Sequence, residues 1–158
     1  MRASAANAAL LDAAAMSLAF AKSTIFPGCT LMRCQAVTDV RGALVALETG
    51  RHVPFLIARV SFMYGVDPTE PMGFRAHHAL HQWVVCIAGS CTMRFNDGQA
   101  WREAALNSPD LGVYIGPMIW HEMYDFAPGT VLMGLASALY DEADCIRDFE
   151  AFVMLAKK

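Results

Sequence analysis

Three of the five histidines in this chain, His77, His78 and His81, fall within five residues of one another in the stretch GFRAHHALHQWVVCIAGS. Histidine binds transition metals, and it also carries protons near neutral pH because its unperturbed pKa is about 6.5. The stretch therefore fits a metal site or an acid/base site. It also fits surface histidines on a loop that leads into a strand.

The surrounding residues favour proton chemistry over metal binding. A metal site at the mouth of a small jelly-roll barrel uses two histidines one residue apart, a carboxylate soon after, and a histidine from a distant strand. Here those positions hold Arg75, His77, Gln82 and His121. Arginine keeps its proton and cannot bind a cation, and zinc or iron needs three or four protein ligands. We expect no metal and no cofactor, and His77 is then free to move protons.

The other histidines are ambiguous. His78 neighbours His77 on a strand, so it should point to the opposite face. We interpret His78 and His81 as bystanders, although either is a possible substitute metal ligand. His121 is alternatively a half-buried ring packed beside Trp120 and Tyr124.

Composition limits the class of protein. The 158 residues predict one domain, and 56% hydrophobic residues are enough to bury a core. The net charge of −3 gives no positive field for nucleic acid or an anionic membrane. The five cysteines form no CxxC pair, which favours reduced thiols and a cytoplasmic location.

The first 22 residues, MRASAANAALLDAAAMSLAFAK, imitate a secretory signal, but Asp12 interrupts the apolar run. We expect residues 1–28 to form an Ala-rich N-terminal extension and residues 29–158 to form the folded domain. No segment reaches the roughly 18 apolar residues of a membrane span.

The rest of the chain predicts short strands followed by one helix. Period-two alternation and turn residues such as Asp97-Gly98, a signal for a two-residue hairpin, predict an all-β sandwich or small barrel. The helical spacing of apolar residues in YDEADCIRDFEAFVMLAKK predicts a C-terminal helix capped by Asp141. The predicted strands are 42–48, 55–64, 82–89, 91–97, 112–117 and 130–137.

From about Cys29 to Phe152 the chain resembles the sugar-nucleotide 3,4-ketoisomerases of the cupin superfamily. The resemblance is carried by DVRGALVALE, VPFLIARV, GFRAHHALHQWVVCIAGSCTMRFNDG, NSPDLGVYIGPMIWHEMYDF and LASALYDEADCIRDFEAF. It implies a metal-free cupin jelly-roll barrel, most often a homodimer that exchanges N-terminal strands.

The resemblance also implies a reaction. It implies conversion of dTDP-4-keto-6-deoxyglucose to the dTDP-3-keto-6-deoxyhexose through an enediol-like intermediate. The product would feed the synthesis of amino deoxysugars for surface polysaccharides or glycosylated metabolites. The alternative is a non-catalytic or diverged dTDP-sugar-binding cupin, and a metal-dependent cupin enzyme is a third reading.

The motif R-G-x-H-A-H of these enzymes is altered in this chain. Its second histidine falls on His77, its first on Arg75 and its arginine on Met72, and an aromatic pair is replaced by Ser61 and Phe62. Arginine is a poor base at neutral pH. We therefore predict that His77 is the base and that Arg75 is its electrostatic partner.

Ligand anchoring is predicted to use arginines at positions that match the family. Arg41 and Arg59 are expected to reach the nucleotide or its diphosphate, because arginine offers charged bidentate donors to phosphate. The alternative for each is a surface charge at a strand edge. Gln82, Tyr114 and His121 are expected to contact the ligand, although Tyr114 also fits a core position.

Overall fold

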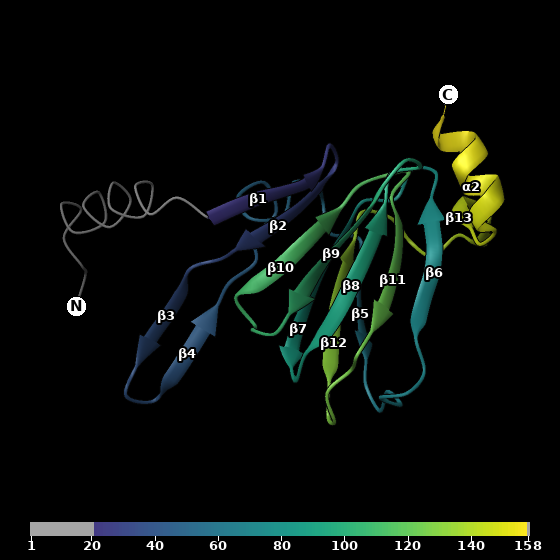
Figure 1. The fold of residues 1–158 in the computed structure, drawn as a ribbon. Coiled ribbons are helices and arrows are strands. Elements are labelled where there is room, and N and C mark those ends of the chain that lie inside the picture. The colour runs from purple at the N-terminus through teal and green to yellow at the C-terminus, as the bar shows by residue number, and fades with distance from the viewer. Residues whose placement is uncertain (1–20, 158) are drawn as a thin grey trace.

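The computed structural model describes residues 21–157, which form two antiparallel sheets that face each other (Figure 1). The larger sheet has six strands in the order β1-β2-β10-β7-β12-β5. Their bounds are β1 Ala21–Phe26, β2 Cys29–Arg33, β10 Leu111–Ile115, β7 Gln82–Ala88, β12 Val131–Ala136 and β5 Arg59–Met63. Neighbouring strands here are often far apart in sequence, so the layer is assembled by long-range pairing.

The second sheet has five strands in the order β13-β6-β11-β8-β9, and a separate two-stranded hairpin, β3-β4, projects away from both sheets (Figure 1). The bounds are β13 Cys145–Ile146, β6 Met72–His77, β11 Trp120–Tyr124, β8 Cys91–Asn96, β9 Trp101–Leu106, β3 Ala36–Asp39 and β4 Gly42–Val45. Two facing antiparallel sheets confirm the predicted all-β jelly-roll architecture.

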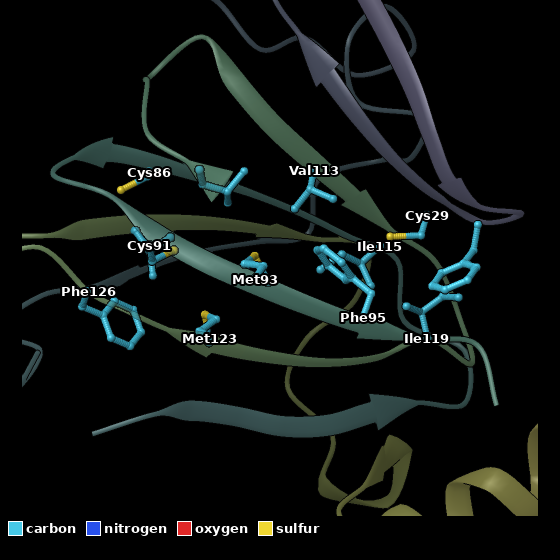
Figure 2. Packing of buried hydrophobic residues seen from close by; sticks show 13 residues of the cluster. Cys29, Cys86, Cys91, Met93, Phe95, Val113, Ile115, Ile119, Met123 and Phe126 are labelled. Atoms are coloured by element: carbon cyan, nitrogen blue, oxygen red, sulfur yellow. The ribbon is translucent and has the colours of Figure 1, made fainter. Parts of the chain in front are cut away.

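The main core lies between the two sheets, where apolar side chains from both layers meet (Figure 2). Met93 and Phe95 from β8 point toward Val113 and Ile115 from β10, and all four are almost fully buried. Because side chains alternate along a strand, the same strands present their remaining residues outward. Four of the five cysteines are buried, and burial raises the pKa of Cys29 and of Cys91 to about 12.

The C-terminal helix is present, but it starts later than the sequence indicated. Asp141 caps only a 3₁₀ turn, Glu142–Asp144, and the chain then pairs with β6 as strand β13. Helix α2 spans Phe149–Ala156, and the Asp148 carboxylate caps it by accepting a hydrogen bond from the amide of Ala151 at 2.7 Å. The prediction that Asp141 caps the C-terminal helix was therefore wrong. Asp141 and Asp148 are both suitable N-cap residues, so the sequence alone did not distinguish them.

The hairpin at Asp97-Gly98 is confirmed, but its loop has four residues, since Asn96 pairs with Trp101. The side-chain oxygen of Asn96 accepts a hydrogen bond from the amide of Gly98, and the Asp97 carboxylate accepts one from the amide of Ala100. These bonds explain the extra length of the loop. The six predicted strands correspond to β4, β5, β7, β8, β10 and β12, in most cases shortened.

The predicted Ala-rich extension falls mostly on residues 1–20, which lie outside the described residues. Residues 21–26 of that segment form β1, which pairs with β2 at the edge of the larger sheet. Within residues 21–157, no helix is long and apolar enough to cross a membrane.

Candidate active site in the barrel interior

A cavity of about 400 Å³ lies between the sheets, with walls from β5, β6, β7, β8, β11 and β12. Val84, Met93, Met123 and Leu132 give it apolar walls. The structure brings together in it five of the residues predicted to act on a ligand: Arg59, Arg75, His77, Gln82 and His121. A mostly apolar cavity with a few convergent polar groups is the usual form of a small-molecule site.

A β-bulge on β6 sets which side chains enter the cavity. Arg75 pairs with His121 and Gly73 with Glu122, so Phe74 is an extra residue on β6. Phe74 has φ +49° and Gly73 has φ +96°. A Cβ on Gly73 would lie 3.0 Å from the backbone oxygen of His121, so the close approach of β6 to β11 requires glycine there. Beyond the bulge, Arg75 and His77 share the inner face.

His77 is buried in this cavity and is 7% exposed. Burial holds its pKa below the ordinary value. The nearby guanidinium groups of Arg75 and Arg59 also lower that pKa, whereas the carboxylate of Asp144 opposes the shift. The imidazole is therefore neutral at neutral pH, which is the form that accepts a proton.

His121 is more strongly perturbed than His77. Complete burial lowers the pKa of His121 to about 3, and His77 and Arg75 act in the same direction. Its ring lies nearly parallel to that of His77, with the centroids 6.3 Å apart. The Nδ1 atom of His121 is buried without a hydrogen bond of normal geometry. His121 therefore stays neutral and presents a polar ring to the cavity.

Arg59 and Tyr140 also line the cavity. The guanidinium carbon of Arg59 lies 5.7 Å from the centre of the Tyr140 ring. Tyr140 in turn donates a hydrogen bond to Glu142, which forms a bidentate pair with Arg147. Arg59 is half-buried, so its guanidinium is available to an anionic ligand.

Tyr114 and His81 lie elsewhere. Val113 and Ile115 face the core, so alternation along β10 places Tyr114 on the outer face of the larger sheet. Its hydroxyl lies 2.7 Å from Nδ1 of His81, and the two rings stack. His78 is exposed, as its place next to His77 predicted.

Arg41 also lies outside the cavity. It sits at the turn of hairpin β3-β4, which projects from the barrel (Figure 1). Its side chain is 86% exposed and paired with Asp39. The hairpin carries this arginine away from the barrel of its own chain.

Two residues at the cavity were missed by the sequence analysis. Tyr140 lines the cavity, and Asp144 lies directly behind His77, with 3.3 Å between Oδ2 and Nδ1. Both belong to YDEAD, which was interpreted as the start of a helix. The sequence signal that could have found them is the acidic run itself, because carboxylates between a strand and a helix also supply partners for buried cationic side chains.

No group of three or more His, Cys, Asp or Glu side chains in residues 21–157 is arranged to hold a metal ion. Arg75 and Gln82, at the two remaining positions of the metal frame, line the same cavity as His77 and His121. These donors do not fit a metal centre, because the two remaining positions carry a fixed cation and a neutral amide.

A second, larger groove of about 670 Å³ lies between the base of hairpin β3-β4 and the outer face of the larger sheet. Its lining is mostly apolar and includes Val45, Val60, Val85, Ile87 and Met133. Several large apolar side chains nearby are exposed, among them Val37 at 66%, Leu44 at 62% and Leu56 at 79%. An apolar groove beside exposed apolar side chains is typical of an interaction surface.

A jelly roll with imidazole and guanidinium groups gathered in its interior is a barrel of the cupin type. The chain belongs to the family described as FdtA: WxcM-like, C-terminal, whose model matches residues 27–157.

Named relatives are similar over most of the chain. The TDP-4-oxo-6-deoxy-alpha-D-glucose-3,4-oxoisomerase of Aneurinibacillus thermoaerophilus is 46% identical over 116 residues, which cover 73% of this chain and 84% of that protein. The TDP-quinovose 3,4-ketoisomerase WlaRB of Campylobacter jejuni is 40% identical, with a TM-score of 0.79, covering 82% of this chain and 99% of that one. A mutant of the 3,4-ketoisomerase QdtA of Thermoanaerobacterium thermosaccharolyticum, in complex with TDP-4-keto-6-deoxyglucose, is 36% identical, with a TM-score of 0.81, covering 84% and 96%.

Proposed function

We propose that this protein is a sugar-nucleotide 3,4-ketoisomerase that converts dTDP-4-keto-6-deoxyglucose to the dTDP-3-keto-6-deoxyhexose by metal-free proton transfer. The observation that carries the proposal is the buried His77 imidazole, held neutral beside the Arg75 guanidinium in a cavity of sugar size. Membership of the FdtA family and the activities named for its relatives support the same reaction.

In this mechanism the Nε2 atom of His77 takes the proton from C3 of the sugar. The C3–H electron pair forms a C3=C4 double bond, and the carbonyl electron pair moves to O4. The proton of the 3-hydroxyl then passes to O4, which leaves the negative charge on O3. When O3 re-forms a carbonyl at C3, C4 takes the proton from the His77 imidazolium, so no atom or electron is gained or lost.

Arg75 is the electrostatic partner in this scheme. Its guanidinium lies on the same face of β6 as His77 and carries a fixed positive charge. A preorganised cation close to the enediolate oxygens stabilises the charge that develops there. Its proximity also keeps His77 deprotonated before substrate binds, which favours the base form.

Substrate binding is proposed to use the polar groups that line the cavity. Arg59, beside Tyr140, would contact the diphosphate, while Gln82 and His121 would contact the sugar. Arg41 and Tyr114 lie outside the cavity of their own chain. A role for either in ligand binding requires a site shared with a second copy.

We infer that the protein is a homodimer whose second copy covers the apolar groove beside hairpin β3-β4. Strands of this chain line the groove. Beside it, the apolar side chains of Val37, Val40 and Leu44 are exposed on the hairpin that projects from the barrel. Two-stranded hairpins are only marginally stable in water unless they pack on another element.

The free thiols of the described residues are in keeping with a cytoplasmic enzyme.

Turnover of dTDP-4-keto-6-deoxyglucose, followed by NMR of the sugar protons, tests the proposed function. His77→Asn should lower the rate by about 10² to 10⁴-fold, the usual contribution of a positioned acid/base group. The matched control is His78→Asn, because His78 is the exposed neighbour of His77. Wild-type rate in His77→Asn would refute the assignment of the base.

A further inference from the structure

The carboxylate of Asp144 lies beside the His77 imidazole. Asp144 ends the 3₁₀ turn Glu142–Asp144, just before β13, and its Oδ2 lies 3.3 Å from Nδ1 of His77. The two side chains are 19% and 9% exposed, so water screens the pair only partly. A second small cavity, of about 220 Å³, is lined by both residues and also by Arg59 and Tyr140. His77 therefore lines both the interior cavity and a small chamber that two aspartates, Asp141 and Asp144, also line.

The Asp144 carboxylate is itself held in place by the backbone that follows His77. Oδ1 accepts a hydrogen bond from the amide of Ala79 at 2.8 Å, and Oδ2 accepts one from Leu80 at 3.2 Å. The carbonyl of Asp144 accepts from the amide of His78 at 3.0 Å, and Cys145 pairs with His77 in the strand register. A side chain fixed by neighbouring backbone has little freedom to turn away from the imidazole.

A carboxylate accepts hydrogen bonds and does not donate them, so it requires the hydrogen of a neutral imidazole on Nδ1. The other nitrogen, Nε2, then carries the lone pair. Which ring nitrogen is protonated is determined by the partner of the other one. Cys145 also approaches Nδ1, with 3.7 Å to Sγ, but a thiol is a weak partner beside a carboxylate.

We propose that Asp144 is a positioning residue for the base: it holds the His77 proton on Nδ1, leaves Nε2 as the reactive atom, and stabilises the imidazolium formed during turnover. The proposal deepens the proposed function and rests on it for the identity of the reaction.

The charges around His77 make Asp144 necessary in this role. Arg75 from β6, Arg59 from β5 and His121 from β11 all approach His77, and the two arginines lower its pKa. The Cys145 thiol from β13 brings no negative charge when protonated, and burial raises its pKa. Asp144 is the group among these neighbours that favours the protonated ring, both through its charge and through a hydrogen bond. Without it, removal of a substrate proton would leave an imidazolium beside two guanidinium groups.

The test compares wild-type protein with Asp144→Asn by two measurements. Protein labelled with ¹⁵N-histidine reports the tautomer and the titration of His77, whose signal is assigned by its loss in His77→Asn. The proposal expects hydrogen on Nδ1 in the wild type and, in Asp144→Asn, a change of tautomer with titration at lower pH. In steady-state kinetics, kcat should fall by about 10²-fold or more with little change in KM, and the acid limb of kcat/KM should move to lower pH.

The control is Asp141→Asn, an aspartate that caps the same turn by accepting a hydrogen bond from the amide of Ala143 and is not among the groups that shift the pKa of His77. It should keep the wild-type tautomer and acid limb. If Asp144→Asn fails to fold, Asp144→Glu retains the charge and should keep the acid limb nearer that of the wild type.

Hydrogen on Nε2 in the wild type overturns the proposal, and so does an unchanged acid limb in a folded Asp144→Asn. The NMR measurement needs no turnover. Failure of the wild type to isomerise the sugar would therefore refute the proposed function while the tautomer still decides the role of Asp144.

Discussion

Arg75 and His121 are paired directly across β6 and β11, and both project into the interior cavity. A permanent cation therefore lies next to an imidazole that burial already keeps neutral. This pairing converts what resembles a metal-binding frame into a site that presents the Arg75 guanidinium and two uncharged imidazoles to an organic ligand.

Replacement of Arg75 tests its electrostatic role. Arg75→Gln should lower kcat by about 10² to 10³-fold, the effect of removing one donor aimed at a developing oxyanion. The control is Arg94→Gln on β8, whose guanidinium packs over Trp101 outside the cavity. The rates are measured by NMR of the sugar protons. An unchanged rate in Arg75→Gln would contradict the assignment.

Arg75→His restores the histidine of the related motif, and it separates catalysis from binding alone. An active wild type is expected, with Arg75→His also active. Activity found only in the variant would favour a dTDP-sugar-binding protein without turnover.

The affinity for dTDP tests Arg59 as the proposed anchor of the diphosphate. Arg59→Ala should weaken binding by about 10- to 100-fold, because a charged hydrogen bond contributes about 1.5–3 kcal/mol. Calorimetric titration measures the dissociation constant. Arg102→Ala, an exposed arginine on β9, is the control and should bind as the wild type does. Equal affinity in the two variants would place the diphosphate elsewhere.

The buried imidazole of His121 makes stability depend on pH. Its pKa is about 3 in the folded chain and about 6.5 when unfolded, so the unfolded state binds the proton more readily as the pH falls below 6.5. Stability is therefore complete above pH 6.5 and decreases toward pH 3. His121 alone should remove about 2 kcal/mol between pH 7 and pH 5.

Urea unfolding at the two pH values measures this loss. His121→Gln should reduce the difference by that amount, whereas His78→Gln, at an exposed position, should retain the wild-type difference. If the loss is the same in His121→Gln, the titrating group responsible lies elsewhere.

If a second copy covers hairpin β3-β4, a charged substitution on the hairpin should change the protein from a dimer to a monomer. Leu44→Glu on β4 would place a charge in the covered surface, so sedimentation velocity should show a monomer. Met154→Glu on α2 alters a side chain of similar exposure away from that surface and should remain dimeric. A dimeric Leu44→Glu would exclude the hairpin from the interface.

Much of the fold could be predicted because strands such as β7 and β8 show clear alternation with turn residues at their ends. The bulge at Phe74 could not be predicted, because it depends on the close approach of Gly73 to the backbone of His121. The interior placement of His77 follows from period two once the strand is recognised.

The positions of Tyr114 and Asp144 were not predictable by the same reasoning. The register of β10 decides that Val113 and Ile115, and not Tyr114, face the core. Asp144 follows a capping aspartate in an acidic run that also suits a helix start, and only the pairing of β13 with β6 brings it to His77. Contacts between segments separated by more than 60 residues depend on tertiary packing, which no local pattern specifies.

Strand β7 serves two surfaces at once. Gln82 and Val84 line the interior cavity, whereas Val85 and Ile87 line the outer groove. Successive substitutions along this one strand would therefore affect different properties in turn, chemistry at one position and assembly at the next. If the inferred dimer forms through this groove, selection can change the ligand by altering every second residue while the intervening residues keep the interface.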